Sequence, residues 1–186
     1  MDQKMDLTKI TEGVRSALKS QYHSALAMMK ESIERCPEDL WYNNKPVNTF
    51  WQIAYHALFF AHCYSQKDEA SFHPWEQHQA KVQYPDGIAG PPEPNNPLPL
   101  LPKPYTKAQI LAYWSFCDQM IDHAVDEMDV HSAESGFSWY KVSKLEHQLV
   151  NIRHIQHHTA QLADRLRTAL DIGINWVGAK RSSKTT

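Results

Sequence analysis

The 186-residue sequence predicts an all-α fold of four long helices in one domain, from three observations. Apolar residues recur every three or four positions over four long stretches, which is the spacing of a helix with one buried face. Nine of the eleven prolines fall between Pro74 and Pro104, so no regular helix is expected there. The length suits one domain with a sizeable core. We therefore expect residues 1–186 to form a single helical domain, with 66–104 as an irregular proline-rich insert and 180–186 as a frayed tail.

The first two helices are predicted from their apolar patterns and their starts and ends. Helix one covers about residues 6–36, and Pro37 ends it because proline disfavours helical backbone at the preceding residue. Residues 38–47 are expected to form a connector. Helix two begins at residue 48 or 49 and runs to about 64. Thr49 and Gln52 have the spacing of a capping box, in which a hydroxyl and an amide each satisfy a backbone donor. The apolar residues of this helix lie on almost every side of it, which predicts that the helix is mostly buried.

The proline-rich insert, residues 66–104, is too long for an ordinary connection within a compact domain. It carries apolar residues that need burial: Phe72, Trp75, Tyr84, Ile88, Leu98, Leu100 and Leu101. We expect it to pack over the helices as a crossing loop or lid, in preference to presenting a proline motif to a partner.

Helices three and four follow the insert. Thr106 and Gln109 form a second predicted capping box, and helix three continues to about residue 128. Ser143 and Glu146 are the expected start of helix four, which extends to about residue 170 before Gly173 releases the chain. Its apolar stripe is predicted to be Leu145, Leu149, Ile152, Ile155, Leu162, Leu166 and Leu170.

Three of the eleven histidines have the arrangement of a metal site. His154 and His158 are four residues apart in helix four, so they share a face with Cβ atoms about 5–6 Å apart. Two imidazoles placed in this way can bind one ion. His56 lies in the apolar second helix, where a buried polar ring without a partner costs about 1–3 kcal/mol. One histidine from one helix and a pair from another predict a three-histidine site.

Alternatives to this interpretation remain open at the level of the sequence. Taken alone, His56 is also consistent with a core histidine bonded to a backbone carbonyl, and the pair with two solvated side chains; together they favour a metal. His147 is a candidate fourth ligand, proton shuttle or supporting partner, and Gln161 is a candidate to orient a ligand or to bond a water. His157 is interpreted as a neighbour only. A surface position is expected for the remaining histidines without a partner at ligand spacing: His23, His73, His78, His123 and His131.

The order of these residues along the chain resembles the DinB/YfiT-like four-helix bundles, a family that includes metal-dependent enzymes and thiol S-transferases. That family has one histidine in its second helix and a His-x-x-x-His pair in its fourth, usually followed by Gln or His one turn later. His56, His154, His158 and Gln161 match this pattern, and the resemblance covers most of the chain outside the insert. It implies a four-helix bundle and a divalent metal ion on His56, His154 and His158. It also implies transfer of the sulfur of a low-molecular-weight thiol to an electrophilic small molecule.

The sequence leaves several alternatives for the metal and for the reaction. Neutral imidazoles suit Zn²⁺, Ni²⁺, Cu²⁺ or Fe²⁺, and we expect zinc first and nickel second. Hydrolysis by a bound water would use the same site. The competing class is a non-catalytic bundle that binds a metal for stability, or a partner through the insert.

The charge and the cysteine content indicate which partners and which cellular compartment to expect. A net charge of −2 with both signs interspersed predicts no nucleic-acid and no membrane partner. Cys36, Cys63 and Cys117 are odd in number and far apart, which predicts free thiols in a reducing compartment. Without an apolar signal region or a stretch of roughly 20 apolar residues, we expect a cytoplasmic protein.

Large apolar side chains are numerous on the first three helices: Tyr22, Trp51, Tyr55, Phe59, Phe60, Tyr113, Trp114 and Phe116. Several of them are expected to face outward, and large exposed apolar patches usually mark an interface. We therefore favour a homodimer, the commonest assembly. Cover by the insert within one chain is the rival explanation.

Overall fold

The computed structural model describes residues 7–45, 48–84 and 103–180, so part of the insert and most of the predicted tail lie outside the described residues. Within those ranges every regular element is a helix, as predicted for an all-α fold, and there is no strand. The helices are α1 (Leu7–Arg35), α2 (Glu38–Trp41), α3 (Phe50–Tyr64), α4 (Lys107–Glu127) and α5 (Lys144–Leu170). No helix in this part of the chain is both long and apolar enough to cross a membrane.

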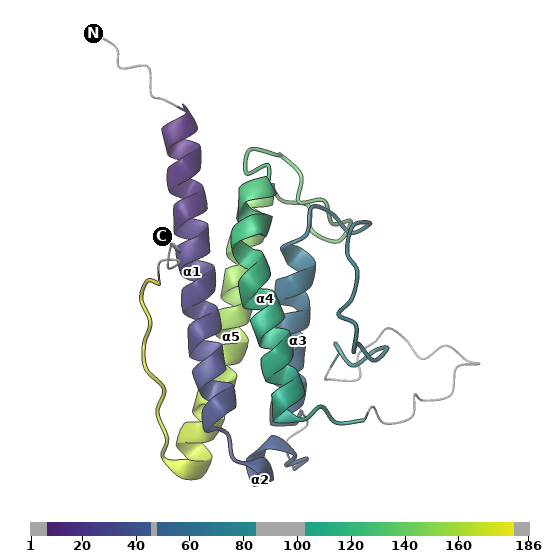
Figure 1. Cartoon of the computed structure of the whole chain (residues 1–186), viewed down its shortest axis with the longest axis vertical. Helices are drawn as coiled ribbons and strands as arrows, with labels where there is room; N and C mark the ends of the chain where they lie inside the picture. The colour runs from purple at the N-terminus through teal and green to yellow at the C-terminus, as the bar shows by residue number, and fades with distance from the viewer. Residues whose placement is uncertain (1–6, 46–47, 85–102, 181–186) are drawn as a thin grey trace, which may run out of the picture.

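The four long helices lie side by side, as Figure 1 shows. Helices α1 and α3 each pack against both α4 and α5, so the core lies between these two pairs. After α5, residues 171–180 return along α1 (Figure 1). They are held there by Asn175, whose backbone N–H and side-chain amide donate to the Glu31 carboxylate at 3.0 and 2.9 Å.

The helix starts are defined by the capping residues that the sequence indicates. Both predicted capping boxes are present, at Thr49 for α3 and at Thr106 for α4. At the start of α5, the Ser143 hydroxyl accepts from the backbone N–H of Glu146 at 3.2 Å. The end of α5 differs from the prediction, because Asp171 and not Gly173 takes the left-handed conformation, with φ 55°, that stops the helix.

The connector after α1 contains a short helix that the sequence analysis did not predict. Glu38–Trp41 forms one turn, α2, which carries Trp41 into the core. The Trp41 indole N–H donates to the Tyr105 carbonyl at 2.9 Å. A single turn has no apolar repeat, and this contact with a residue far along the chain fixes it.

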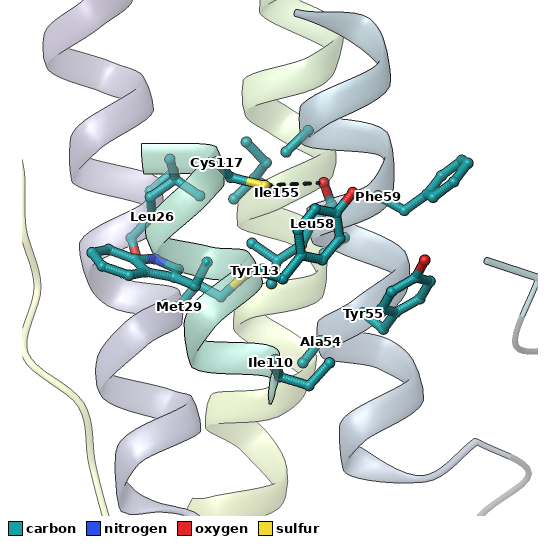
Figure 2. Packing of buried hydrophobic residues seen from close by; sticks show 14 of the residues in the cluster. Leu26, Met29, Ala54, Tyr55, Leu58, Phe59, Ile110, Tyr113, Cys117 and Ile155 are labelled. Atoms are coloured by element: carbon teal, nitrogen blue, oxygen red, sulfur yellow. Dashed lines mark hydrogen bonds between the residues drawn. The ribbon is translucent and has the colours of Figure 1, made fainter. Parts of the chain in front are cut away.

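The core joins all four long helices. Figure 2 shows Leu26 of α1, Leu58 of α3, Cys117 of α4 and Ile155 of α5 meeting in one cluster. The Cys117 thiol donates to the Leu58 carbonyl at 3.6 Å (Figure 2). Burial raises the pKa of this thiol well above its usual value, and it raises the pKa of Cys36 and of Cys63 to about 12. All three cysteines are free, as predicted, and burial keeps them protonated.

The apolar stripe predicted for α5 is wrong at two of its seven positions. Leu149 is 51% exposed and Leu170 is also exposed, whereas Gln148 and Asn151 are fully buried. The Tyr22 hydroxyl donates to the Gln148 side-chain oxygen at 2.6 Å, and the Asn151 amide donates to the Tyr22 oxygen at 2.9 Å. These hydrogen bonds offset the cost of burying polar groups, so the first half of α5 faces the core with a polar surface.

The described part of the insert packs against α3 and α4 and contains no helix, as predicted. Trp75 is buried and stacks on Tyr113 of α4, with ring centroids 4.6 Å apart and planes at 10°. The Tyr55 hydroxyl of α3 lies 2.6 Å from Nδ1 of His78. The segment therefore forms part of the folded domain.

This packing removes the main reason for expecting a dimer. Most of the aromatic residues that were expected to face outward are buried within one chain: Tyr22, Trp51, Tyr55, Phe59, Tyr113 and Trp114. Phe60 is half-buried and Phe116 is exposed. The insert covers part of the aromatic surface, in line with the rival explanation. The homodimer stays a prediction that light scattering can test.

Candidate metal centre

Helices α3 and α5 bring the three predicted histidines together. His56 lies near the middle of α3, and His154 and His158 lie one turn apart near the middle of α5. Nε2 of His154 is 3.0 Å from Nε2 of His56 and 3.1 Å from Nε2 of His158. The three side chains are half-buried, so the cluster lies at the edge of the core.

The second ring nitrogen of two of these histidines has an acceptor. Nδ1 of His56 lies 2.6 Å from the carbonyl oxygen of Gln83, and Nδ1 of His158 lies 2.8 Å from the side-chain oxygen of Gln161. An oxygen of this kind only accepts, so each Nδ1 carries the proton. In a neutral ring the lone pair is then on Nε2, and both lone pairs point toward Nε2 of His154.

His154 lies between these two rings. Burial, and then the charges that the neighbouring imidazoles can carry, lower the pKa of His154 to about 3, so its ring is neutral at neutral pH. Its Nδ1 is buried and has no hydrogen-bond partner among the described residues. When the proton is on that nitrogen, three Nε2 lone pairs face one point, and this is the arrangement that a cation stabilises.

The spacing of the three nitrogens also fits an ion. Ligands about 2.0–2.1 Å from a tetrahedral ion lie about 3.3 Å from each other, close to the two Nε2 separations in the cluster. All three potential ligand atoms lie within 4.8 Å of one another, so the cluster could hold a metal ion. In the parts of the chain that the structure describes, it is the one such group of His, Cys, Asp and Glu.

Gln161 and His147 were both predicted as possible supporting residues, and the structure separates them. Gln161 contacts the cluster through His158, and its amide nitrogen lies 3.3 Å from Nε2 of the neighbouring His157. His147 is fully buried among the rings of Tyr64, Phe137 and Tyr140, at 4.7, 4.9 and 4.9 Å, and it is not part of the cluster. The possible role of His147 as a fourth ligand therefore has no support in the structure.

The sequence analysis missed one supporting group and misplaced two histidines. The Gln83 carbonyl belongs to the backbone, so no side-chain pattern could reveal it. His78 was expected at the surface but is half-buried, with Nδ1 2.6 Å from the Tyr55 hydroxyl. His23 was expected at the surface but is buried, with Nδ1 2.7 Å from Asp118 and Nε2 3.0 Å from Asp122. Both carboxylates lie on α4, one turn apart, and this spacing is the only signal that the sequence offered.

The geometry defines a three-histidine candidate metal centre shared by two packed helices. Comparison of the chain with protein-family models, with curated proteins and with solved structures finds no match.

Proposed function

We propose that the chain is a DinB/YfiT-like four-helix bundle in which His56, His154 and His158 bind one divalent metal ion, zinc in the first place and nickel in the second. The observation that carries the proposal is the convergence of three Nε2 atoms from two helices. The order of the ligands supports the family: one histidine on the second long helix, a pair on the fourth, and Gln161 after it.

The proposed activity is that of a metal-dependent enzyme acting on a small molecule. Three protein ligands leave a position open for a substrate, as in catalytic zinc sites. A divalent ion held there favours the deprotonated form of a thiol or a water that reaches it. The residues of the chain bind the ion and fix the ring orientations through Gln83 and Gln161.

The nucleophile in this proposal comes from outside the chain. Burial keeps the thiols of Cys36, Cys63 and Cys117 protonated, with the pKa of Cys36 and of Cys63 raised to about 12. A cysteine reacts as its thiolate, so none of the three suits attack at neutral pH. We therefore favour transfer of a low-molecular-weight thiol to an electrophile, with hydrolysis by water as the variant at the same site.

Metal analysis tests the proposed binding. Wild-type protein should hold close to one zinc or nickel ion per chain, and His154→Ala should hold much less. His157→Ala is the matched control, because His157 is next in sequence to His158 but is not in the cluster. Full occupancy in a variant with all three histidines replaced by alanine would refute the assignment.

Turnover tests the reaction. Thiol consumption with a panel of electrophiles should require added Zn²⁺ or Ni²⁺ and should be lost in His154→Ala. Ester or amide hydrolysis without any thiol would favour the hydrolase variant. No turnover of either kind in a metal-loaded protein would argue against an enzyme.

A non-catalytic metal site is the second candidate, because an ion on these ligands would cross-link α3 and α5. A chelator separates the two. A structural ion supports the fold, so its removal should lower the helix content and the melting temperature. A catalytic ion should be removed with loss of turnover and with the helices intact.

A further inference from the structure

A second concave site lies away from the histidine cluster, at the end of the domain where α3 and α4 finish and α5 begins. It is a cavity of about 820 Å³ between α3, α4 and the connector before α5. This volume is in the range of pockets that bind small molecules. His62 of α3 lines it, and His62 and His56 are six residues apart, so the two side chains point about 120° apart around the helix. The cavity therefore belongs to a different face of α3.

The floor of the cavity is an apolar face of α4. Phe116, Met120 and Ala124 are spaced four residues apart, so they share one side of the helix, and all three line the cavity. Phe116 is exposed, and Met120 and Ala124 are half-buried. This surface suits a hydrocarbon chain.

The rim of the cavity is acidic. Four carboxylates and two ammonium groups line it, which leaves a net charge of −2 when its histidines are neutral. One ammonium, that of Lys144, donates to the carbonyls of Gln66 and Lys67 at 3.4 and 2.7 Å. Glu127, Asp129 and Glu134 form no ion pair with any residue in the described ranges.

His62 adds a polar group that points to a ligand independently of the charges. Its side chain is 5% exposed, and Nδ1 lies 3.2 Å from the Tyr113 hydroxyl. That hydroxyl is buried and has no other partner among the described residues, so it donates to Nδ1. The remaining proton of the ring is then on Nε2, which has no hydrogen-bond partner within the same ranges. This N–H keeps some exposure, so water or the acceptor of a ligand in the cavity can take it.

We propose that this cavity binds an organic amine, a protonated primary amine with an apolar chain and a hydrogen-bond acceptor at its far end. The ammonium group pairs with Glu127 at the acidic rim, where the charges of Asp129 and Glu134 add to the attraction, and the chain lies on Phe116 and Met120. The acceptor takes the N–H of His62. The proposal does not depend on the metal ion.

A probe with reversed charge tests the chemical class. 6-Aminohexan-1-ol should bind the full-length protein about tenfold more tightly than 6-hydroxyhexanoate, because the carboxylate of the latter meets the acidic rim. Higher salt should weaken the binding of the amine, since the carboxylates lie at the rim. Equal affinity of the two probes, or no binding of the amine at millimolar concentration, would overturn the proposal.

Methionine-methyl NMR locates the site without any substitution. The Met120 and Met128 signals should shift on addition of the amine because both residues line the cavity, whereas Met29, in the core between the helices, should not. Glu127→Gln should weaken binding roughly two- to fivefold, while Glu12→Gln, an exposed site on α1, should not change it. Zinc content should be the same in both variants. Shifts confined to other methionines, or equal weakening by both substitutions, would place the amine elsewhere.

Discussion

The two outer imidazoles of the histidine cluster depend on the atoms that hold their Nδ1 protons. Gln161 accepts from His158 at 2.8 Å, so Gln161→Leu removes the acceptor and frees the ring to rotate or to change tautomer. We expect zinc affinity to fall about tenfold, the lower end of the effect of such supporting residues. Competition titration with a chromogenic chelator measures it.

Gln119→Leu is the matched control for this substitution. Gln119 is exposed on α4, and its amide donates to Ser115 one turn away on the same helix. Zinc affinity should stay at the wild-type value in this variant. If both substitutions leave the affinity unchanged, Gln161 does not support the ligand.

His147 should make the protein sensitive to acid. Its ring is fully buried without hydrogen-bond partners among the described residues, and burial, followed by the charge of Lys144, lowers its pKa to about 4. A folded-state pKa below the unfolded value of about 6.5 means that stability is present above pH 6.5 and is lost as the pH falls toward 4. At pH 5 the loss should be roughly 1–2 kcal/mol.

His147→Phe removes the titrating group and keeps an aromatic ring among Tyr64, Phe137 and Tyr140. Urea unfolding at pH 7 and pH 5 should give a smaller stability difference in the variant than in the wild type. His62, whose pKa burial also lowers to about 4, keeps part of the dependence. An unchanged difference would mean that the His147 ring is solvated or paired in solution.

At the residue scale, local spacing could predict the ligands and the nearby support from Gln161, but not the support that comes from distant residues. His154 and His158 are one turn apart, and His56 is a polar ring in an apolar helix, so both signals are local. The carboxylate partners of His23 follow it by 95 and 99 positions, and the carbonyl that holds His56 comes from an irregular segment. No periodic pattern encodes contacts of this kind.

Among the helix pairs, α1 and α4 are joined by a clamp whose charge depends on pH. His23 contacts Asp118 and Asp122 through both ring nitrogens, and these hydrogen bonds raise its pKa despite the opposing effect of burial. A raised folded-state pKa means that the stabilisation is complete below the unfolded value of about 6.5 and is lost as the pH rises through the folded value. His23→Gln should therefore destabilise the protein more at pH 5.5 than at pH 9, by on the order of 1–3 kcal/mol at the lower pH.

The neighbouring ion pair of Lys19 with Asp126 joins the same helices and serves as the control. It is more exposed, so Lys19→Met should cost at most about 1 kcal/mol, with little difference between the two pH values. Urea unfolding of both variants makes the comparison. A His23→Gln effect that is the same at both pH values would show that the ring is not charged in the clamp.

The bounds of the helices were the most predictable feature of the elements. Caps at Thr49, Thr106 and Ser143, and the proline after Cys36, act within a few residues of each helix end, so sequence alone indicates them. The face that α5 turns to the core was predicted less well. Polar residues of α5 are buried because Tyr22 of α1 forms hydrogen bonds with them. The hydropathy pattern of α5 contains no information about a partner on another helix.

For the molecule as a whole, docking of the insert should couple to the metal centre. Trp75 stacks on Tyr113, and the same segment ends near the Gln83 carbonyl that holds His56. Trp75→Ala should destabilise the domain by roughly 3 kcal/mol, as truncation of a buried aromatic does. It should also speed proteolysis within 66–84 and weaken zinc binding.

Trp176→Ala is the matched control, because it is the same substitution at a tryptophan that is 77% exposed. It should change neither proteolysis nor zinc affinity. If Trp75→Ala speeds proteolysis but leaves zinc affinity at the wild-type value, the segment covers the helices without supporting His56.

The positions of the ligands along the chain also bear on when the site can form during synthesis. His56 precedes His154 by 98 residues, and α5 follows α1, α3 and α4 along the chain. Synthesis starts at the N-terminus, so the residues of α1, α3 and α4 are made before the paired histidines. A nascent chain therefore carries only one of the three ligands, His56, which alone binds metal weakly, until α5 is made and docks. Capture of the ion would then be among the last events of folding.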